Sequence, residues 1–290
     1  MFSFTAFTAL FGAVVGFFLY DPKAIPGLWH ARMIAILAKH LLWKGNQSLT
    51  ETSAIGPLAP STIFRPRRTH SYCSIAEIDL NMHKSNSTFY ADIDLSRIEL
   101  LATLFKDAIT PLSPRASLAP DNAYSRRNRR RQLIAALGGI NGVFRREIKP
   151  YQRYELVSRV LAWDEKWIYI VSYFLKPSQA KKDAEITDDR ILASAVSKYV
   201  FKQGRQTVEP AEVLTNLGLL AGDHAAQSDA DDSADVPASA PEHLPLPRQD
   251  LVDYPNHSGS ESDEWTWSHV EVERKRGLAI AKHLVGLNGV

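Results

Sequence analysis

Two apolar runs with a very short connection decide how this chain folds: YELVSRVLAW at residues 154–163 and KWIYIVSYFLK at residues 166–176. Both are rich in the β-branched and aromatic residues that are typical of strands. Because only Asp164 and Glu165 separate them, we expect the two strands to pair as a tight antiparallel hairpin.

The segments on either side of this hairpin predict the rest of a sheet and one long helix. Strand-like residues occupy 69–77, 132–148 and 191–202, and glycines in the second of these indicate a bulge or a close backbone approach. A helix is expected from an N-cap at Ser85 or Ser87 to about residue 107. Its apolar residues lie on more than one side, so it should be enclosed. The order of strand, long helix and four strands predicts an α+β fold in which an antiparallel sheet wraps around one helix.

The composition is that of one folded body rather than a disordered or multi-span membrane protein. Hydrophobic residues make up 45% of the 290 residues and charged residues 23%, which is close to the globular average. A net charge of +2 gives no general reason to expect a nucleic-acid partner. The single cysteine, Cys73, cannot form an internal disulfide, which favours a reducing compartment.

The N-terminal segment is predicted to anchor the protein in a membrane. Residues 2–20 contain no charge, and a helix of that length reaches about 28 Å, just enough to span a bilayer. We therefore expect a single-pass transmembrane anchor over 1–22, with a cleaved signal peptide as the alternative. The basic residues that follow predict a body on the cytoplasmic side. A juxtamembrane and linker region is expected over 23–62, with a helix at 26–43 that lies against the membrane or against the body.

The C-terminal part changes its composition twice. Between Asp223 and Glu264 there are eleven Asp or Glu residues, one Arg and five Pro, so we expect a disordered acidic loop over 221–265. Apolar residues then recur at mostly helical intervals and predict a helix within 266–290 that docks back on the body. The folded domain is accordingly expected at 63–220.

The densest group of reactive side chains lies in the stretch DLNMHKSN at residues 79–86, between the first strand and the long helix. A helix N-terminus presents unpaired N–H groups and a partial positive charge, so it can bind the oxygen of a polarised carbonyl. Asp79, one turn ahead, could attack that carbonyl or remove a proton from water. His83 and Asn86 could hold the loop or orient the substrate. A capped, hydrogen-bonded turn without any chemistry is the alternative.

The stretch DLNMHKSNSTFY at residues 79–90 resembles the loop and helix start of hot-dog-fold thioesterases related to 4-hydroxybenzoyl-CoA thioesterase. Asp79, His83 and Asn86 match the pattern of that family. Ser85 stands where the first Asn of a pair is usual, and Phe89 stands where Tyr is usual.

Two later segments extend the resemblance: GGINGVFRREIKPYQRYELVSRVLAWDEKW at 138–167 and VERKRGLAIA at 272–281. Both are similar to a membrane-anchored, thioesterase-like branch of the same superfamily, which includes fungal members associated with secondary-metabolite pathways. The resemblance implies a hot-dog fold, pairing of two subunits, and hydrolysis of an acyl thioester of coenzyme A or of a carrier protein.

In that family the position of Asp79 carries the catalytic carboxylate, so the resemblance makes Asp79 the nucleophile or general base. His83 and Asn86 are expected to support it, and Asn81, Ser85 and Ser87 are assigned to substrate binding. The departures at Ser85 and Phe89 motivate a second hypothesis, a non-catalytic acyl-thioester-binding or scaffolding protein. Hydration or dehydration of an acyl thioester is the third, although hydratase members space their Asp and His differently.

The strongest basic run in the chain is RRNRRR at 126–131. Arg126, Arg127 and Arg129 are predicted to bind the phosphates of coenzyme A, an acidic carrier protein or anionic lipid. A solvated loop is the alternative, and no aromatic platform accompanies the arginines as RNA binding would require. No cofactor or metal is expected, because Asp79 and His83 alone are too few ligands for zinc.

Overall fold

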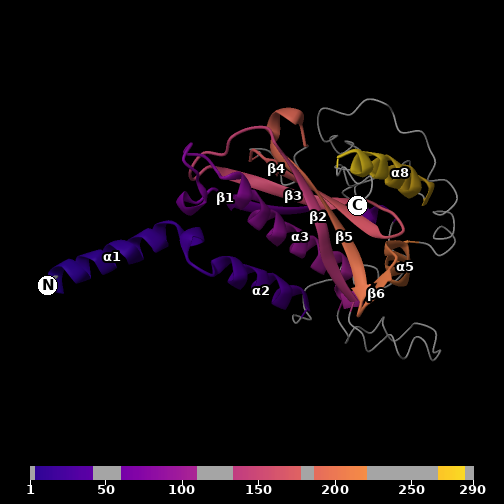
Figure 1. Cartoon of the computed structure of the whole chain (residues 1–290), viewed down its shortest axis with the longest axis horizontal. Helices are drawn as coiled ribbons and strands as arrows, with labels where there is room; N and C mark the ends of the chain where they lie inside the picture. The colour runs from indigo at the N-terminus through magenta and orange to yellow at the C-terminus, as the bar shows by residue number, and fades with distance from the viewer. Residues whose placement is uncertain (1–3, 42–59, 110–132, 178–185, 221–266, 285–290) are drawn as a thin grey trace, which may run out of the picture.

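The computed structural model describes residues 4–41, 60–109, 133–177, 186–220 and 267–284, so the acidic stretch predicted at 221–265 lies outside the described residues. Its centre is one antiparallel sheet of strand order β1-β3-β4-β5-β2, with β6 paired to β5 (Figure 1). The strands are β1 (Arg67–Tyr72), β2 (Leu133–Phe144), β3 (Arg153–Trp163), β4 (Trp167–Leu175), β5 (Ile191–Gln203) and β6 (Gln206–Val208). The α-helices are α1 (Phe4–Tyr20), α2 (Leu28–Leu41), α3 (Asn86–Ile109), α5 (Pro210–Asn216) and α8 (Trp267–Leu284). Short 3-10 helices are η1 (Pro22–Ala24), η2 (Pro60–Phe64), η3 (Ile75–Glu77) and η5 (Asp188–Arg190).

The hairpin predicted from the sequence is confirmed, because β3 and β4 pair in antiparallel register with Ser158 opposite Ser172. The turn is closed by one carboxylate. Asp164 Oδ1 accepts hydrogen bonds from the backbone N–H groups of Lys166 (2.8 Å) and Trp167 (2.6 Å). An Asp that bonds to the backbone of its own turn in this way allows a very short connection between strands.

The central strands are buried on both faces of the sheet. On one face, Leu156 of β3 belongs to a buried cluster with Ile93 of α3. On the other face, Val157 belongs to a buried cluster with Leu278 of α8. Successive side chains of a strand point to opposite faces, so a strand covered by helices on both sides is apolar at nearly every position. This double cover explains why the hairpin reads as two continuous apolar runs.

The long helix α3 is enclosed, as its apolar residues on several sides predict. The sheet lies along one side of α3, and α2 lies along another (Figure 1). Trp29 Nε1 of α2 donates a hydrogen bond to the carbonyl oxygen of Ala91 (3.0 Å), and His40 Nε2 lies 3.0 Å from Glu99 Oε1. The helix expected within 26–43 therefore packs against the body. An antiparallel sheet curled around one central helix is a hot-dog-like fold.

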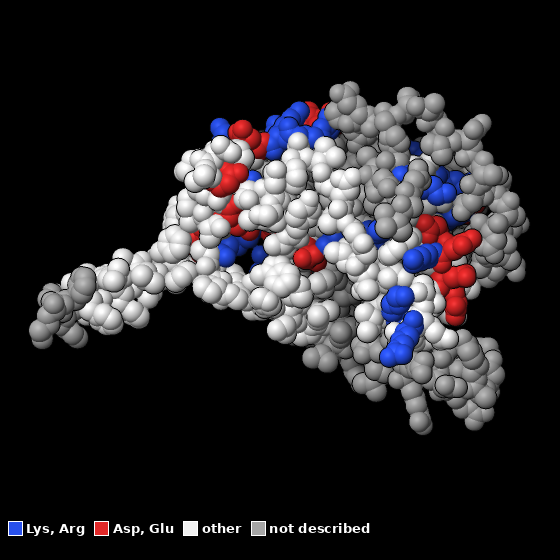
Figure 2. Space-filling view, viewed as in Figure 1, with Lys and Arg blue, Asp and Glu red and all other residues white. Residues whose placement is uncertain are grey.

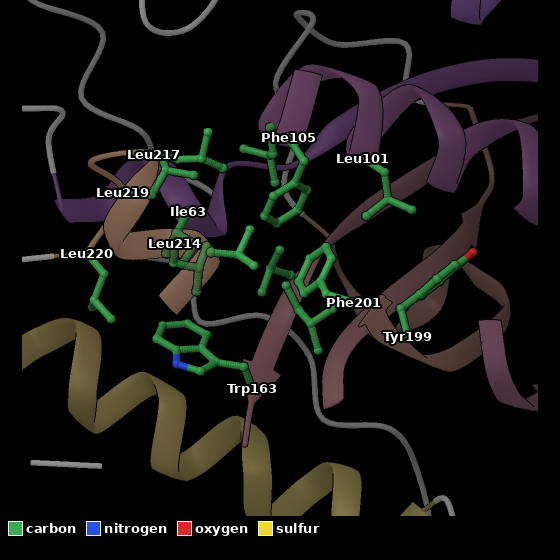
Figure 3. Close-up of a cluster of buried hydrophobic side chains, with 14 of the residues drawn as sticks. Ile63, Leu101, Phe105, Trp163, Tyr199, Phe201, Leu214, Leu217, Leu219 and Leu220 are labelled. Carbon is green, nitrogen blue, oxygen red and sulfur yellow. The ribbon is translucent and has the colours of Figure 1, made fainter. Parts of the chain in front are cut away.

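The core around the C-terminal half of α3 includes two elements that the sequence analysis did not predict, β6 and α5. Leu214 of α5 is fully buried, and Trp163 lies between α5 and α8 (Figure 3). The rings of Phe105 and Phe201 pack with their centroids 5.1 Å apart. Elements this short contain too few residues for a hydrophobic period to stand out from a loop.

Helix α8 lies directly on β3 at Gly277, where a Cβ atom would come within 2.2 Å of the Leu161 carbonyl oxygen. We expect Gly277→Ala to lower the free energy of unfolding by about 1–3 kcal/mol, because the helix must shift away from the strand. Urea unfolding measures this loss. The control is Val272→Ala, at an exposed position of the same helix, and it should stay within about 0.5 kcal/mol. Equal stability of the two variants would contradict the close contact.

Helix α1 projects from the body, and its visible surface shows no charged side chain (Figures 1 and 2). None of the helices in the described ranges is long and apolar enough to cross a membrane. The transmembrane helix predicted over 1–22 is therefore not found among the described residues.

Candidate active site

A tight loop connects η3 to α3 and carries the predicted site residues Asp79, Asn81 and His83. Its two ends are held together by an isolated antiparallel bridge between Ile78 and Lys84. Within the loop, the Asp79 N–H donates to the His83 carbonyl (3.0 Å), and the Met82 N–H donates to the Asp79 carbonyl (3.0 Å). Met82 has a φ of 60°, the left-handed conformation that lets the chain reverse within so few residues.

The carboxylate of Asp79 is partly exposed and lies beside the imidazole of His83. The two side chains are 32% and 22% exposed, and His83 Nδ1 lies 3.5 Å from Asp79 Oδ1. The same carboxylate oxygen accepts a hydrogen bond from the Asn81 N–H (2.9 Å). Asp79 is therefore oriented by the loop while remaining accessible to water and to a ligand.

Three further predicted residues, Ser85, Asn86 and Ser87, lie at the start of α3, which begins at Asn86. Ser85 precedes the helix, and its carbonyl accepts hydrogen bonds from the Thr88 hydroxyl (2.7 Å) and the Thr88 N–H (2.9 Å). The hydroxyls of Ser85 and Ser87 lie 3.1 Å apart. The first N–H groups of a helix have no intrahelical acceptor, so this end of α3 can donate to a developing negative charge.

The structure thus places the predicted residues in two neighbouring groups. Asp79, Asn81 and His83 share one turn, and Ser85, Asn86 and Ser87 form the beginning of α3. Asn81 contributes its backbone N–H to Asp79, and its side chain is exposed. The third predicted group, Arg126, Arg127 and Arg129, lies outside the described residues.

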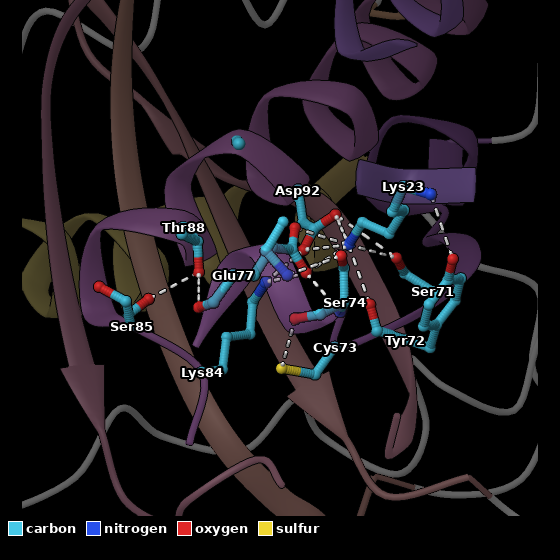
Figure 4. Close-up of polar contacts among 12 residues, drawn as sticks. Lys23, Ser71, Tyr72, Cys73, Ser74, Glu77, Lys84, Ser85, Thr88 and Asp92 are labelled. Carbon is cyan, nitrogen blue, oxygen red and sulfur yellow. Dashed lines mark hydrogen bonds and ion pairs between the residues drawn. The ribbon is translucent and has the colours of Figure 1, made fainter. Parts of the chain in front are cut away.

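A buried group of four charged side chains lies beside this loop: Lys23, Glu77, Lys84 and Asp92, here called the four-charge cluster (Figure 4). Lys84 Nζ lies 3.0 Å from Glu77 Oε2 and 2.9 Å from Asp92 Oδ2. Lys23 Nζ lies 2.8 Å from Glu77 Oε1 and 3.1 Å from Asp92 Oδ1. The side chain of Lys84 is 0% exposed and that of Asp92 is 4% exposed. Two positive and two negative charges balance, and buried charges require such pairing.

The four-charge cluster fixes both ends of the loop that carries Asp79. Glu77 precedes the loop and Lys84 ends it, so their ion pair joins the two ends directly. The backbone adds to this: the Ser85 N–H donates to the Glu77 carbonyl (2.8 Å), and the Lys84 N–H donates to the Ile148 carbonyl (2.8 Å). Asp92 connects the same group to α3, so the loop and the helix start are held by one network.

Asp21 is a fully buried residue that binds the N-terminal segment to the same region. Its carboxylate accepts hydrogen bonds from the Ser74 hydroxyl (2.8 Å), the Ile75 N–H (2.9 Å) and the Tyr72 hydroxyl (2.9 Å). Burial alone would raise the pKa of Asp21, but these hydrogen bonds outweigh it and hold the pKa below its ordinary value. Residues 21–23 therefore contact the folded body, although the sequence analysis assigned them to an anchor and a linker.

Sequence reasoning missed the four-charge cluster, and only one signal pointed toward it. Asp92 lies in a helix with apolar residues on several sides, and a carboxylate enclosed there needs a cationic partner. The partner Lys23 is 69 residues away in the chain. No local pattern could name it.

Cys73 is a buried residue rather than a nucleophile. It is fully buried and forms no disulfide. Burial raises the pKa of its thiol to about 11, so almost no thiolate exists at neutral pH.

The buried carboxylates predict a loss of stability in acid. Burial would raise the pKa of Asp92, but Lys23 and Lys84 outweigh burial and hold that pKa below its ordinary value. Burial would also raise the pKa of Glu99, and His40 holds it below its ordinary value. A lowered folded-state pKa contributes stability that is present above the unfolded-state value and is lost as the pH falls through the folded-state value. The free energy of unfolding, measured in urea from neutral pH to about pH 2, should be constant near neutral pH and should decrease once the pH drops below about 4. A flat profile there would contradict the prediction.

Comparison with known proteins agrees with this geometry. The family model described as thioesterase-like superfamily matches residues 73–237, a range that contains the Asp79 loop and the whole of α3. The probable thioesterase atnL of Emericella nidulans is 42% identical over 228 residues, covering 73% of this chain and 72% of that protein. The thioesterase poxG of Penicillium oxalicum is 37% identical over 292 residues, covering 96% of this chain and 83% of that protein.

Among solved structures, the YbaW probable thioesterase from Escherichia coli aligns over 52% of this chain and 96% of that chain, with 11% identity and a TM-score of 0.36. A score this low adds nothing to the assignment, which follows from the family model and the fungal relatives. The chain belongs to the thioesterase-like superfamily and is a thioester hydrolase.

Proposed function

We propose that hydrolysis takes place at the loop of residues 79–86, with Asp79 as general base or nucleophile. The observation that carries this proposal is the Asp79 carboxylate, which is partly exposed, held by the Asn81 N–H and placed beside His83. The loop ends where α3 begins, so a carboxylate and a set of unpaired helix N–H groups occur within one short segment.

The general-base route needs only groups of this segment. Asp79 takes a proton from water as the water oxygen bonds to the thioester carbonyl carbon, which gives a tetrahedral oxyanion. N–H groups at the start of α3, near Asn86 and Ser87, stabilise the oxyanion, and one such donor is typically worth about 3 kcal/mol. The carbon–sulfur bond then breaks, the thiolate leaves and is protonated, and a carboxylic acid remains. His83 keeps the Asp79 carboxylate in place. If Asp79 acts as the nucleophile, its carboxylate oxygen bonds to the carbonyl carbon, the same donors stabilise the tetrahedral oxyanion, and the thiolate leaves; water then hydrolyses the acyl-enzyme anhydride to the carboxylic acid and regenerates Asp79.

The proposed substrates are acyl thioesters whose thiol is coenzyme A or the arm of a carrier protein. Asn81, Ser85 and Ser87 contact the substrate near its acyl carbonyl group. A role in a fungal secondary-metabolite pathway stays a prediction. The cytoplasmic placement of the body is also a proposal, and it is supported by the single cysteine, because a chain with one cysteine can form no internal disulfide.

We propose that two copies of the chain pair through β2. This strand lies at one end of the strand order and exposes Ile134, Leu137 and Phe144, whereas an unpaired edge strand normally carries charges that prevent association. Sedimentation equilibrium of the full chain should give a dimer, and Leu137→Lys should shift it toward a monomer. A monomeric parent protein would refute the pairing.

The experiment that tests the site is hydrolysis by the full-length protein across a panel of acyl-coenzyme A and acyl-carrier substrates. Release of free thiol reports turnover, and the panel identifies the acyl preference. Saturable binding of acyl thioesters by a folded protein that turns over none of them would instead favour the non-catalytic acyl-binding alternative. Phe89, one of the departures behind that alternative, is 3% exposed and packs against Phe144 and Phe174, so it supports the core rather than the substrate.

A further inference from the structure

A groove of about 570 Å³ lies between the N-terminal segment and the β1 edge of the sheet. One wall comes from the end of α1, from η1 and from α2, and the other comes from β1 and the turn before β3. Its volume is in the range of pockets that hold small organic ligands. The Asp79 loop does not line this groove, so it is separate from the candidate active site.

The charged side chains that line the groove are the three cations Lys23, Arg32 and Arg153; His70 lies beside them, and no Asp or Glu is among the lining residues. This is a strong local excess, because the net charge of the whole chain is only +2. Lys23 is already neutralised by Glu77 and Asp92. Its charge therefore adds little to the attraction of an anion.

Arg32 and Arg153 are the cations that remain available. Within the described residues, neither side chain has a hydrogen bond or an ion pair. Two arginines on the adjacent strand behave differently, since Arg67 lies 3.4 Å from Glu99 and Arg68 lies 3.5 Å from Glu155. Two guanidinium groups facing a groove without a carboxylate fit a phosphate, which arginine binds through paired N–H donors.

Apart from Ser71, the rest of the lining is aromatic and aliphatic, which favours an organic phosphate over an inorganic one. Tyr20 and Tyr151 pack edge to face with ring centroids 5.3 Å apart, and Tyr72 forms part of the opposite wall. The Tyr151 backbone has a φ of 59° and is held by its N–H, which donates to the Cys73 carbonyl (2.7 Å). The Tyr72 hydroxyl is held by Asp21 (2.9 Å). The Tyr72 side chain, which this hydrogen bond fixes, loses little freedom when a ligand binds.

We propose that this groove binds the phosphate of an organic phosphate ester, with Arg32 and Arg153 on the phosphate and the tyrosine rings against the organic part. Two sources have this chemistry, a phospholipid headgroup and the phosphates of coenzyme A or of a phosphopantetheine arm. Lys23 connects the groove with the Asp79 loop, because it lines the groove and also belongs to the four-charge cluster that holds the ends of the loop.

The test is a binding measurement that does not depend on turnover, so it stands or falls separately from the proposed hydrolysis. Isothermal titration calorimetry of the full-length protein uses three probes: dihexanoyl phosphatidic acid, dihexanoyl phosphatidylcholine and coenzyme A. Preference for phosphatidic acid over both others would assign the groove to an anionic lipid headgroup, and preference for coenzyme A would assign it to the thioester carrier. Either result supports the proposal.

The variant that tests the site is Arg32→Gln combined with Arg153→Gln. It should raise the Kd of the probe that binds best by about 10-fold or more, as expected when charge-assisted hydrogen bonds are lost. The matched control is Lys166→Gln combined with Arg205→Gln, which removes the same charge from turns elsewhere on the surface. Unchanged unfolding in urea excludes a folding defect. Equal weakening by both double variants, binding that ignores Arg32 and Arg153, or no binding of any probe would overturn the proposal.

Discussion

Asp79→Asn should reduce thioester hydrolysis by about 10²–10⁴-fold, the usual contribution of a positioned general base. The amide keeps the shape of the carboxylate and still accepts the hydrogen bond from the Asn81 N–H, but it can neither take a proton from water nor act as a nucleophile. The unfolding midpoint should change little, because the side chain is partly exposed. The measurement is kcat and KM on the best substrate of the panel. A lower kcat with a similar KM is expected, since binding does not need the charge.

The control for this variant is Asp164→Asn, the same chemical change in the β3–β4 turn. β3 has 11 residues and extends roughly 30 Å, and the end opposite to Asp164 is the one that pairs with Tyr72, just ahead of the Asp79 loop. Asp164→Asn should therefore leave kcat unchanged. Full activity of Asp79→Asn would remove Asp79 from the mechanism, and the chemistry would then have to be sought elsewhere in the chain.

Asp92→Asn should lower the free energy of unfolding by about 3–5 kcal/mol, the range found when one partner of a buried ion pair is removed. The substitution leaves Lys23 and Lys84 with Glu77 as their one remaining carboxylate in the four-charge cluster, so the cluster carries an excess positive charge out of water. It also weakens the interaction with the Tyr154 hydroxyl. Urea unfolding at neutral pH measures the loss.

A second substitution separates the charge imbalance from the loss of shape. Lys84→Met together with Asp92→Asn removes one charge of each sign and leaves the pair of Lys23 and Glu77, which lie 2.8 Å apart. Replacing a buried ion pair by groups of similar volume is often nearly neutral, so the double variant should be more stable than Asp92→Asn alone. The difference from additivity gives the coupling between the two residues. Purely additive losses would show that the charges do not act as one unit.

The same network determines which protein should be assayed. Lys23 donates a hydrogen bond to Glu77, and Asp21 accepts one from the Ile75 N–H, so both contact residues just ahead of the Asp79 loop. A chain that began after the N-terminal helices would lose Lys23, the second cation of the four-charge cluster, and the carboxylate that holds Ser74 and Ile75. Activity measurements therefore belong on the full-length chain.

Much of the fold could be predicted from the sequence because local physics decides it. Asp164 and Glu165 leave room only for a tight turn, so the hairpin follows from the chain itself. The apolar residues on several sides of α3 indicate an enclosed helix. The stretch from Asp79 to Asn86 was recognisable as a candidate site because its residues are contiguous and lie at the start of a helix.

Three features were decided only by the tertiary structure. Lys23 and Asp92 meet because the N-terminal segment folds over β1, and loop closure over 69 residues leaves no trace in a local pattern. Gly277 matters because a carbonyl of β3 lies beside it. Asp21 is buried against Ser74 and Ile75, although the sequence predicted that it belongs to an anchor.

The sequence by itself therefore determined the β3–β4 hairpin, the enclosed helix and the loop that carries Asp79, since each depends on neighbours in the chain. The tertiary structure decided which charges surround that loop and where the basic groove lies. Both depend on segments that are distant in sequence, and a buried charge is tolerated only where the completed fold brings its partner within a few ångströms.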